Sequence, residues 1–353
     1  MNIADITTMR LANQQLVKTR YKTPREIVSW MGAMQAQDFN MAKWGIGVRL
    51  PGITDKQVEK AIDAGELIRT HILRPTWHFV SRDDIHWMLQ LSSPRVKLAV
   101  RSSDRELELS DDLLKKTSAI IRKALEKESN QTRQELGAIL KKADIECDSR
   151  RLSHIMFHAE LDGLVCNGTV KDKKQTYALL EQRVPKTSNY NMDETLYRLA
   201  YKYFQSHGPA TIQDFIWWSG LTATEARSAA ALIKPDFIFE TAGEQTYIYH
   251  QSSSGYKQRD DIVHFLPAFD ELLVSYKDRK EILSLVHHKK VITSNGIFKP
   301  AISYNGEIIG LWKKILDKQN ISSESEFFSQ PDKALERLIK KASGDFDAYL
   351  TGS

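Results

Sequence analysis

The sequence predicts an α+β, mainly helical fold built from tandem winged-helix units, each a helix-turn-helix plus a β-hairpin, with a C-terminal β-rich region. Three times along the chain, helical patterns are followed by two short extended runs that a turn separates. Asn-Gly pairs between apolar runs then mark hairpins towards the C-terminus. No sequence identity links the three copies, so the prediction depends on the order of the elements.

The first unit is predicted over residues 1–100. Apolar residues recur at helical spacing from Asp5, and Thr23-Pro24 has the cap and the first residue of a second helix. A third helix ends at Gly65, and Arg74-Pro75 divides the next extended stretch into two strands. Beyond the helix that starts at Pro24, the predicted elements span residues 5–18, 55–64, 67–73 and 76–80.

Residues 101–190 and 191–255 are predicted to repeat this order. The second unit adds a long helix, and Thr132 with Glu135 has the form of a capping box. Its helices are expected over residues 111–127, 132–142 and 150–161, and its hairpin over 164–168 and 177–180. The third unit is expected to have helices over 193–206, 211–218 and 223–233 and strands over 237–239 and 247–249.

A linker over residues 251–255 leads to the last region, residues 256–353. Asn295-Gly296 and Asn305-Gly306 are strong hairpin signals there. Extended segments are expected at 264–267, 272–276, 290–292, 301–304 and 307–312, and a final helix over 332–341.

The composition is that of an ordinary soluble protein, with 353 residues, 27% of them charged, and a net charge of +5. This mildly basic balance permits an anionic partner without requiring one. The two cysteines, Cys147 and Cys166, suit neither a disulfide scaffold nor a zinc site, which favours a reducing compartment. No signal peptide and no apolar run of roughly 20 residues are recognisable, so we expect a cytoplasmic protein without a membrane partner.

Two glutamines stand close together in Met34-Gln35-Ala36-Gln37-Asp38. Helical periodicity in the preceding residues places this stretch at the inner end of a packed helix, so we expect Gln35 and Gln37 to be held in place. A glutamine carbonyl can fix a water molecule while its NH2 group holds a second acceptor. A Gln-x-Gln pattern is common, however, and more often marks glutamines that only cap a helix end.

Tandem winged helices mostly bind nucleic acid, with phosphate contacts at helix N-termini and at wing tips. Any one such charge is more often a solvated surface residue. At helical spacing, Trp217 and Trp218 are better explained as core residues than as platforms for stacked bases. The candidate contacts are Arg69, His71, Arg74 and His78 near the first wing, Ser149, Arg150 and Arg151 before a helix of the second unit, and Lys171, Lys173 and Lys174 on its wing.

Other chemistry has weaker support. The pairs Asp270-Glu271 and Asp278-Glu281 raise a general acid–base hypothesis, and His287-His288 raises a metal hypothesis. Adjacent histidines do not share a helix face and spacing places no third ligand, so we expect no metal. No P-loop, G-x-G-x-x-G or G-x-S-x-G motif is present, so nucleotide-dependent and serine-hydrolase chemistry have no motif support, and we expect no cofactor.

Four stretches together carry a resemblance that covers most of the chain. They read MQAQD from Met34, LIRTHILRPTWHFV from Leu67, DFIWWSGL from Asp214 and LPAFDELLVSYKDR from Leu266. With these stretches the sequence resembles the winged-helix DNA glycosylases of the AlkZ-like and AlkX-like (YcaQ-like) type. The resemblance implies a concave, basic DNA channel and hydrolysis of the N-glycosidic bond of alkylated purines, such as N7-alkylguanine, bulky adducts or interstrand crosslinks.

The resemblance also implies roles for individual residues. It assigns Gln35 and Gln37 to the family's catalytic motif, with Gln37 on the attacking water and Gln35 supporting the water and the sugar. Lys277 and Arg279, in the last stretch, join the candidate DNA contacts. Asp38 points away from Gln37 in either regular geometry, so we expect it to cap or support the backbone.

We therefore expect a monomeric, monofunctional DNA glycosylase of base excision repair that acts on double-stranded DNA with alkylated bases and associates with the bacterial nucleoid when on DNA. An open channel probed by one hairpin is favoured over a tight pocket for a flipped base. The 277–290 stretch and the Arg74-Pro75 turn are the candidate probes. Two alternatives remain, a non-catalytic winged-helix transcriptional regulator and a binder that sequesters a toxic alkylating metabolite.

Overall fold

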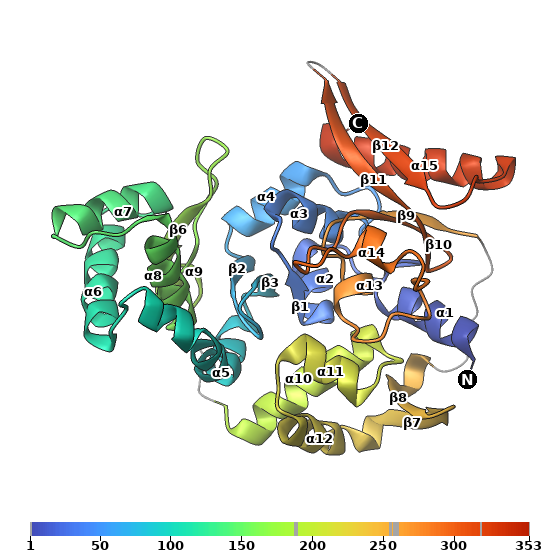
Figure 1. The fold of residues 1–353 in the computed structure, drawn as a ribbon, viewed down its shortest axis with the longest axis horizontal. Coiled ribbons are helices and arrows are strands. Elements are labelled where there is room, and N and C mark those ends of the chain that lie inside the picture. The colour runs from blue at the N-terminus through green and yellow to red at the C-terminus, as the bar shows by residue number, and fades with distance from the viewer. Residues whose placement is uncertain (1, 187–189, 254–255, 257–260, 318–319, 353) are drawn as a thin grey trace. The chain divides into compact units, whose positions relative to one another are not determined.

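The computed structural model describes residues 2–186, 190–253, 256, 261–317 and 320–352. The chain is α+β and mainly helical, as predicted, with several small sheets (Figure 1). It divides into two compact units. The discontinuous unit comprises residues 1–59 and 196–353, and the inserted unit comprises residues 60–195. The four-part division of the sequence stays a prediction.

The discontinuous unit begins with short helices around the two glutamines. The first helix is shorter than predicted, and the glutamine stretch does not continue the second helix as predicted. Gly32 ends that helix with φ +78°, and a Cβ there would lie 3.4 Å from the Lys202 side chain. The elements are α1 (Ile3–Asn13), α2 (Pro24–Met31), β1 (Ala33–Gln35) and α3 (Phe39–Gly47), and α4 (Asp55–Asp63) crosses into the inserted unit.

The inserted unit holds the hairpin of β2 (Leu67–His71) and β3 (Trp77–Ser81), close to its predicted bounds. A long helix, α5 (Ile85–Glu106), was not predicted. Helix α6 (Asp111–Lys127) matches its prediction, and the predicted capping box of Thr132 and Glu135 opens α7. The remaining elements are β4 (Gln131–Thr132), α7 (Arg133–Lys142), α8 (Ser149–Leu161), β5 (Val165–Asn167), β6 (Thr176–Leu179) and α9 (Leu180–Arg183), with sheet order β4-β6-β5.

The chain then returns to the discontinuous unit through α10 (Met192–His207). Three helices and a hairpin follow the predicted order, with bounds shifted by a few residues. They are α10, α11 (Ile212–Ser219), α12 (Ala223–Leu232), β7 (Phe237–Ala242) and β8 (Gln245–His250). In the predicted linker, Gln251–Ser253 forms one 3-10 turn, whereas Ser254 and Gly255 lie outside the described residues.

The C-terminal region forms an antiparallel sheet of order β12-β11-β10-β9, against which a helix packs. The Asn305-Gly306 hairpin is confirmed, because both residues have positive φ between β10 and β11. Asn295-Gly296 instead forms a turn closed by a single bridge between Ile292 and Phe298. The elements are β9 (Val263–Leu266), β10 (Ala301–Tyr304), β11 (Glu307–Asp317), β12 (Asn320–Phe327) and α15 (Lys333–Thr351), which is longer than predicted.

Two predicted extended segments of this region are short helices. Residues 272–276 belong mostly to α13 (Glu271–Val274), and residues 290–292 overlap α14 (His288–Val291). Asp270 caps α13 by accepting from the Leu272 N–H at 2.9 Å, so a polar side chain just before the apolar run favours a helical turn over a strand. No helix within the described ranges is long and apolar enough to cross a bilayer.

Candidate active site

The two glutamines lie on the connection between α2 and α3. Gln35 ends β1 and is buried, whereas the side chain of Gln37 is exposed. Gln35 is therefore held by its surroundings, as expected, and the side chain of Gln37 is accessible to solvent.

Asp38, next in the chain, caps α3. Its Oδ1 accepts from the Met41 N–H at 3.0 Å, which confirms the expected capping role.

Asp38→Ala should cost about 1 kcal/mol of unfolding free energy, because one helix N–H loses its acceptor. Asp38→Asn keeps the acceptor and serves as the matched control. We expect both variants to keep wild-type base release in a single-turnover assay. Loss of release in both would instead place Asp38 in the chemistry.

A buried carboxylate fixes the strand that carries Gln35. Glu271 Oε1 accepts the Gln35 backbone N–H at 2.6 Å, and both residues are buried. Its Oε2 accepts the Trp218 indole N–H at 3.2 Å and the Ser275 hydroxyl. His207 Nε2 lies 3.6 Å from the same oxygen. Glu271 thus ties β1 to α10, α11 and α13 at one point.

The same donors lower the pKa of Glu271 and so keep its carboxylate charged. Burial alone raises the pKa of this carboxyl, but donors from His207, Ser275 and the Gln35 backbone outweigh it and lower the pKa to about 2. Burial lowers the pKa of His207, so its imidazole is neutral at pH 7. Glu271 is therefore ionised at every pH at which the protein would work.

Glu271→Gln should destabilise the protein by on the order of 3 kcal/mol at pH 7, because the folded-state pKa is lowered from 4.5 to about 2. A lowered pKa stabilises the fold above the unfolded value and loses that effect as pH falls. The gap between wild type and variant in urea unfolding should therefore narrow from pH 5 towards about 2. Glu324→Gln, in an exposed pair with Lys313, is the control and should show little change.

A second buried ion pair supports the residue next to Glu271. Arg49 donates to both oxygens of Asp270, at 2.8 and 2.9 Å, and neither side chain is exposed. Its other donors go to the Gln14 backbone and side-chain oxygens at 3.0 Å, and Nη1 also donates to the Gly45 carbonyl at 2.8 Å. The pair thereby joins the end of α1, α3 and the start of α13.

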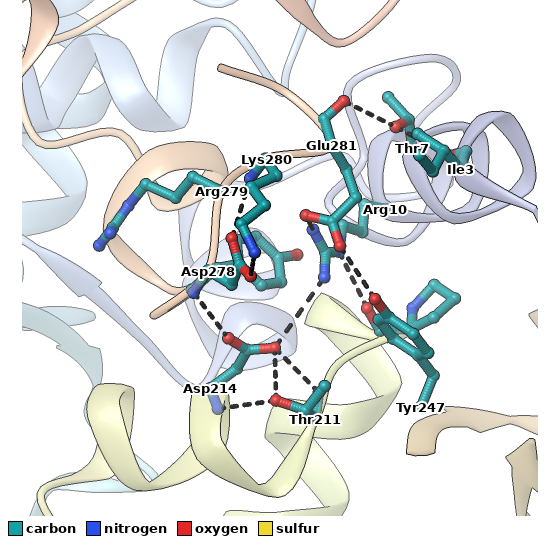
Figure 2. Close-up of polar contacts among 12 residues, drawn as sticks. Ile3, Thr7, Arg10, Thr211, Asp214, Tyr247, Asp278, Arg279, Lys280 and Glu281 are labelled. Carbon is teal, nitrogen blue, oxygen red and sulfur yellow. Dashed lines mark hydrogen bonds and ion pairs between the residues drawn. The ribbon is translucent and has the colours of Figure 1, made fainter. Parts of the chain in front are cut away.

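A third polar cluster holds the loop after α13 (Figure 2). Asp214, whose carboxylate completes the capping box of α11, accepts the backbone N–H groups of Lys277 at 2.8 Å and Asp278 at 3.4 Å. Figure 2 shows Arg10 between Asp214 and Glu281, 4.0 and 3.5 Å from their oxygens. The guanidinium also lies 3.8 Å from the centre of the Tyr276 ring. These contacts fix the backbone from Tyr276 to Glu281.

The two candidate DNA contacts on this loop differ in their surroundings. Lys277 has an exposed side chain. Arg279 is half-buried, and it donates to the carbonyls of Leu273 at 2.6 Å and Lys277 at 3.1 Å. Arg279 also lies over the ring of Trp217, which is 41% exposed, whereas Trp218 is fully buried. The predicted core role of the tryptophan pair is thus confirmed for Trp218 and wrong for Trp217.

In the inserted unit, four candidate contacts lie on the β2–β3 hairpin. One of them, His71, is buried, and its Nδ1 lies 2.6 Å from Glu160 Oε2. Arg69 is buried, donates to Gln175 at 2.5 Å and lies 4.4 Å from the centre of the Trp77 ring. His78 has no exposed surface, and its Nδ1 lies 2.9 Å from the Thr76 carbonyl oxygen. Arg74 is half-buried in the turn. A direct DNA contact by Arg69 or His78 requires the hairpin to rearrange, and their roles stay predictions.

The other six candidates of this unit, which include Ser149 and Lys174, are more exposed. Arg150 pairs with Glu106 at 3.0 Å on the surface, and Arg151 Nη1 donates to the Glu146 carbonyl at 3.2 Å. The carboxylate of Asp148 caps α8, in the place where a phosphate contact was predicted. Lys171 and Lys173 are exposed on the tip between β5 and β6, where Lys171 and Lys174 form a bridge.

The structure therefore places Gln35, Gln37, Lys277 and Arg279 in the discontinuous unit and the other ten candidates in the inserted unit. The sequence did not reveal that Glu271 and Asp214 support this site. Their one signal is a carboxylate inside an otherwise apolar stretch, which is unusual unless the charge has partners. Within the described ranges, no group of three or more His, Cys, Asp or Glu is placed to hold a metal ion.

Comparisons with known proteins identify the family of this chain. The chain is 20% identical to an interstrand DNA cross-link repair glycosylase of Streptomyces sahachiroi over 95% of each sequence. It superposes on the solved DNA glycosylase AlkZ of Streptomyces sahachiroi with a TM-score of 0.81, over 100% of this chain and 97% of that chain, at 17% identity. The profile of the family described as DNA glycosylase AlkZ-like matches residues 28–348. The chain therefore belongs to the AlkZ-like DNA glycosylase family.

Proposed function

We propose that this protein hydrolyses the N-glycosidic bond of alkylated purines in double-stranded DNA, with Gln37 and Gln35 at the reaction centre. The family match over residues 28–348 supports a glycosylase over a transcriptional regulator. The residue assignment depends on the difference in exposure between the two glutamines of the motif. The side chain of Gln37 is exposed, and the backbone of the strand before it is held by Glu271.

The proposed chemistry suits amide side chains. Alkylation at N7 gives guanine a positive charge, so the base leaves without a strong general acid. The remaining tasks are to stabilise an oxocarbenium-like sugar and to orient the water that attacks C1′. The carbonyl oxygen of Gln37 would accept a hydrogen bond from that water, and Gln35 would support the water and the sugar.

The fixed surroundings of the motif contribute to this mechanism. Preorganised dipoles stabilise developing charge because they need no rearrangement during the reaction. The buried Glu271 carboxylate keeps the Gln35 backbone in place, and the Arg49–Asp270 pair keeps α13 in place. Glu271 is a positioning residue in this account, since it contacts the motif and not the reacting atoms.

Binding of duplex DNA would involve both units. The three runs of helices followed by a hairpin are proposed to be winged-helix modules, in which helix N-termini and hairpin tips contact phosphates. Exposed Lys171 and Lys173, together with Arg150, Arg151 and Lys277, are the proposed phosphate contacts. Arg69, Arg74, His78 and Arg279 are proposed to support the DNA-binding surface. The protein is proposed to act as a monomer.

The relative from Streptomyces sahachiroi is an interstrand DNA cross-link repair glycosylase, which suggests a substrate panel. Duplexes with one N7-methylguanine, one bulky N7 adduct or one N7-linked interstrand crosslink are incubated with the protein, and released bases are separated by chromatography. Release from at least one duplex is the expected result. Borohydride is added in parallel, because a lyase would leave a trapped lysine–DNA adduct and a monofunctional enzyme would not. No release from any duplex would overturn the proposed function.

A further inference from the structure

Two adjacent aliphatic side chains stand out on the surface of the discontinuous unit. Leu285 is 72% exposed and Val286 is 80% exposed, the highest values for large apolar residues in the described part of the chain. Single exposed apolar residues are common on soluble proteins, but two neighbours at this level call for a physical reason.

The pair lies at the tip of a tight turn. The His287 N–H donates to the Ser284 carbonyl at 3.0 Å, which places Leu285 and Val286 at the two central positions. Turns favour Gly, Pro, Asn, Asp and Ser at such positions, because these residues suit the backbone and the solvent. Neither the backbone conformation of the turn nor contact with solvent therefore explains why these two positions are apolar.

The base of the turn is firmly held. Before it, Ile282 and Leu283 are buried, and the Ile282 carbonyl accepts the Ile308 N–H at 2.8 Å. After it, α14 follows and ends at the buried Val291. His287 stacks on Phe328 at 4.1 Å between ring centres. The tip is thus a short apolar projection that is held at both ends. It follows in sequence the loop that Arg10 and Asp214 fix, which Figure 2 shows.

Basic side chains flank the tip on both sides. Between Lys277 and Lys290 the sequence has five Lys and Arg residues and two acidic residues. Both acidic groups already have partners. Asp278 pairs with Lys280, and Glu281 contacts Tyr247 and Arg10. The lysines on either side, Lys277, Lys280, Lys289 and Lys290, are exposed. An apolar tip between lysines is complementary to DNA, since phosphates line the groove and the apolar faces of the bases become accessible where a base step is opened.

We infer that Leu285 and Val286 form a wedge that enters duplex DNA and separates a base step, while the flanking lysines bind the phosphates on either side. Proteins that kink DNA insert aliphatic side chains between base pairs in this way. The wedge explains how an enzyme can loosen the stack around a damaged base without enclosing that base. It depends on DNA as the partner, which family membership supplies, and not on the catalytic role of Gln37.

A lipid surface is the less suitable partner for this tip. Interfacial binding requires a broad apolar face, usually one side of an amphipathic helix, and grows with the apolar area that is buried. Two side chains on a tight turn offer little area. They do, however, match the thickness of one opened base step, which is the scale on which intercalating side chains act.

The test uses the full-length chain and a duplex with one N7-methylguanine on a 2′-fluoro sugar, which slows cleavage, beside the fluorescent base 2-aminopurine. Fluorescence rises when 2-aminopurine loses its stacking partner. We expect a rise with wild type and none with the double variant Leu285→Ser/Val286→Ser. Leu98→Ser is the matched control, because Leu98 is 67% exposed but lies on α5 of the inserted unit.

Affinity gives a second readout. The double variant should bind this duplex about tenfold more weakly, through loss of apolar burial. The slope of the affinity against salt concentration should stay as in wild type, because every lysine remains. Both side chains are exposed, so folding should be unaffected, and thermal unfolding checks this.

Three results would overturn the inference. They are a fluorescence rise that persists in the double variant, an unchanged affinity, or a loss confined to binding of anionic phospholipid vesicles. If wild type raises the fluorescence but releases no base from any duplex of the substrate panel, the wedge stands and the proposed catalysis fails. The two proposals therefore fail separately.

Discussion

Gln37→Ala is expected to lower the rate of base release by about 100- to 1000-fold, the usual effect of removing one preorganised dipole from a reaction centre. The variant loses the carbonyl that is proposed to hold the attacking water. Because the side chain is exposed, truncation leaves no cavity, and both stability and DNA affinity should be unchanged. Single-turnover release from a duplex with one N7-methylguanine, alongside a binding titration, measures the effect.

Two companion variants sharpen this experiment. Asn40→Ala changes another exposed amide close by on α3 and should keep full activity. Gln35→Ala removes a buried side chain, so it should lose activity and also some stability. Equal losses of release and of DNA affinity in Gln37→Ala would contradict the assignment, since they would indicate a binding role.

Asp270→Ala is expected to destabilise the protein by about 3–5 kcal/mol, because it leaves the buried Arg49 guanidinium without its anion. This would be the largest effect of any single substitution discussed. Equilibrium unfolding in urea at pH 7 measures it, with the slope compared to establish that the transition stays cooperative.

Asp345→Ala is the matched control for this result. Asp345 lies 3.9 Å from Lys341 in an exposed pair, which is expected to contribute less than about 1 kcal/mol. Similar effects of the two substitutions would show that Arg49 finds water or another acceptor, and that the buried pair does not hold α3 and α13 together.

Local signals in the sequence predicted the helices well. Thr132, Thr211 and Thr222 each cap a helix through a capping box, and Gly220 ends one with positive φ. These signals act within a few residues, so they can be recognised without tertiary information. The long helix after β3 was overlooked because a proline, Pro94, lies within it.

Tertiary contacts decided the elements that were predicted wrongly. The apolar run at 272–276 has the composition of a strand, but Asp270 and Glu271 have buried partners that place it in a helical turn. Such partners are invisible to periodicity. The glutamine stretch leaves its helix at Gly32, whose positive φ ends the helix and which the periodicity does not register.

The candidate site, like the fold, could be predicted only in part from the sequence. The types and spacing of Gln35 and Gln37 were recognisable from the motif. Their supports were not, because Glu271 is 236 residues from Gln35 and Asp270 is 221 residues from Arg49. The exposure of each basic candidate could not be predicted from the sequence either. Arg69 and Lys171 are both basic residues at a predicted wing, but Arg69 is buried and Lys171 is exposed.

The most direct test of the central claim is the product analysis of one reaction. Wild-type protein is incubated with a duplex that carries a single N7-methylguanine, and the products are examined by mass spectrometry and by alkali treatment. Free 7-methylguanine together with an alkali-labile strand of the mass of an abasic product is the predicted result. An intact strand that keeps its methylated base, with DNA bound but unchanged, would contradict glycosidic hydrolysis of this lesion.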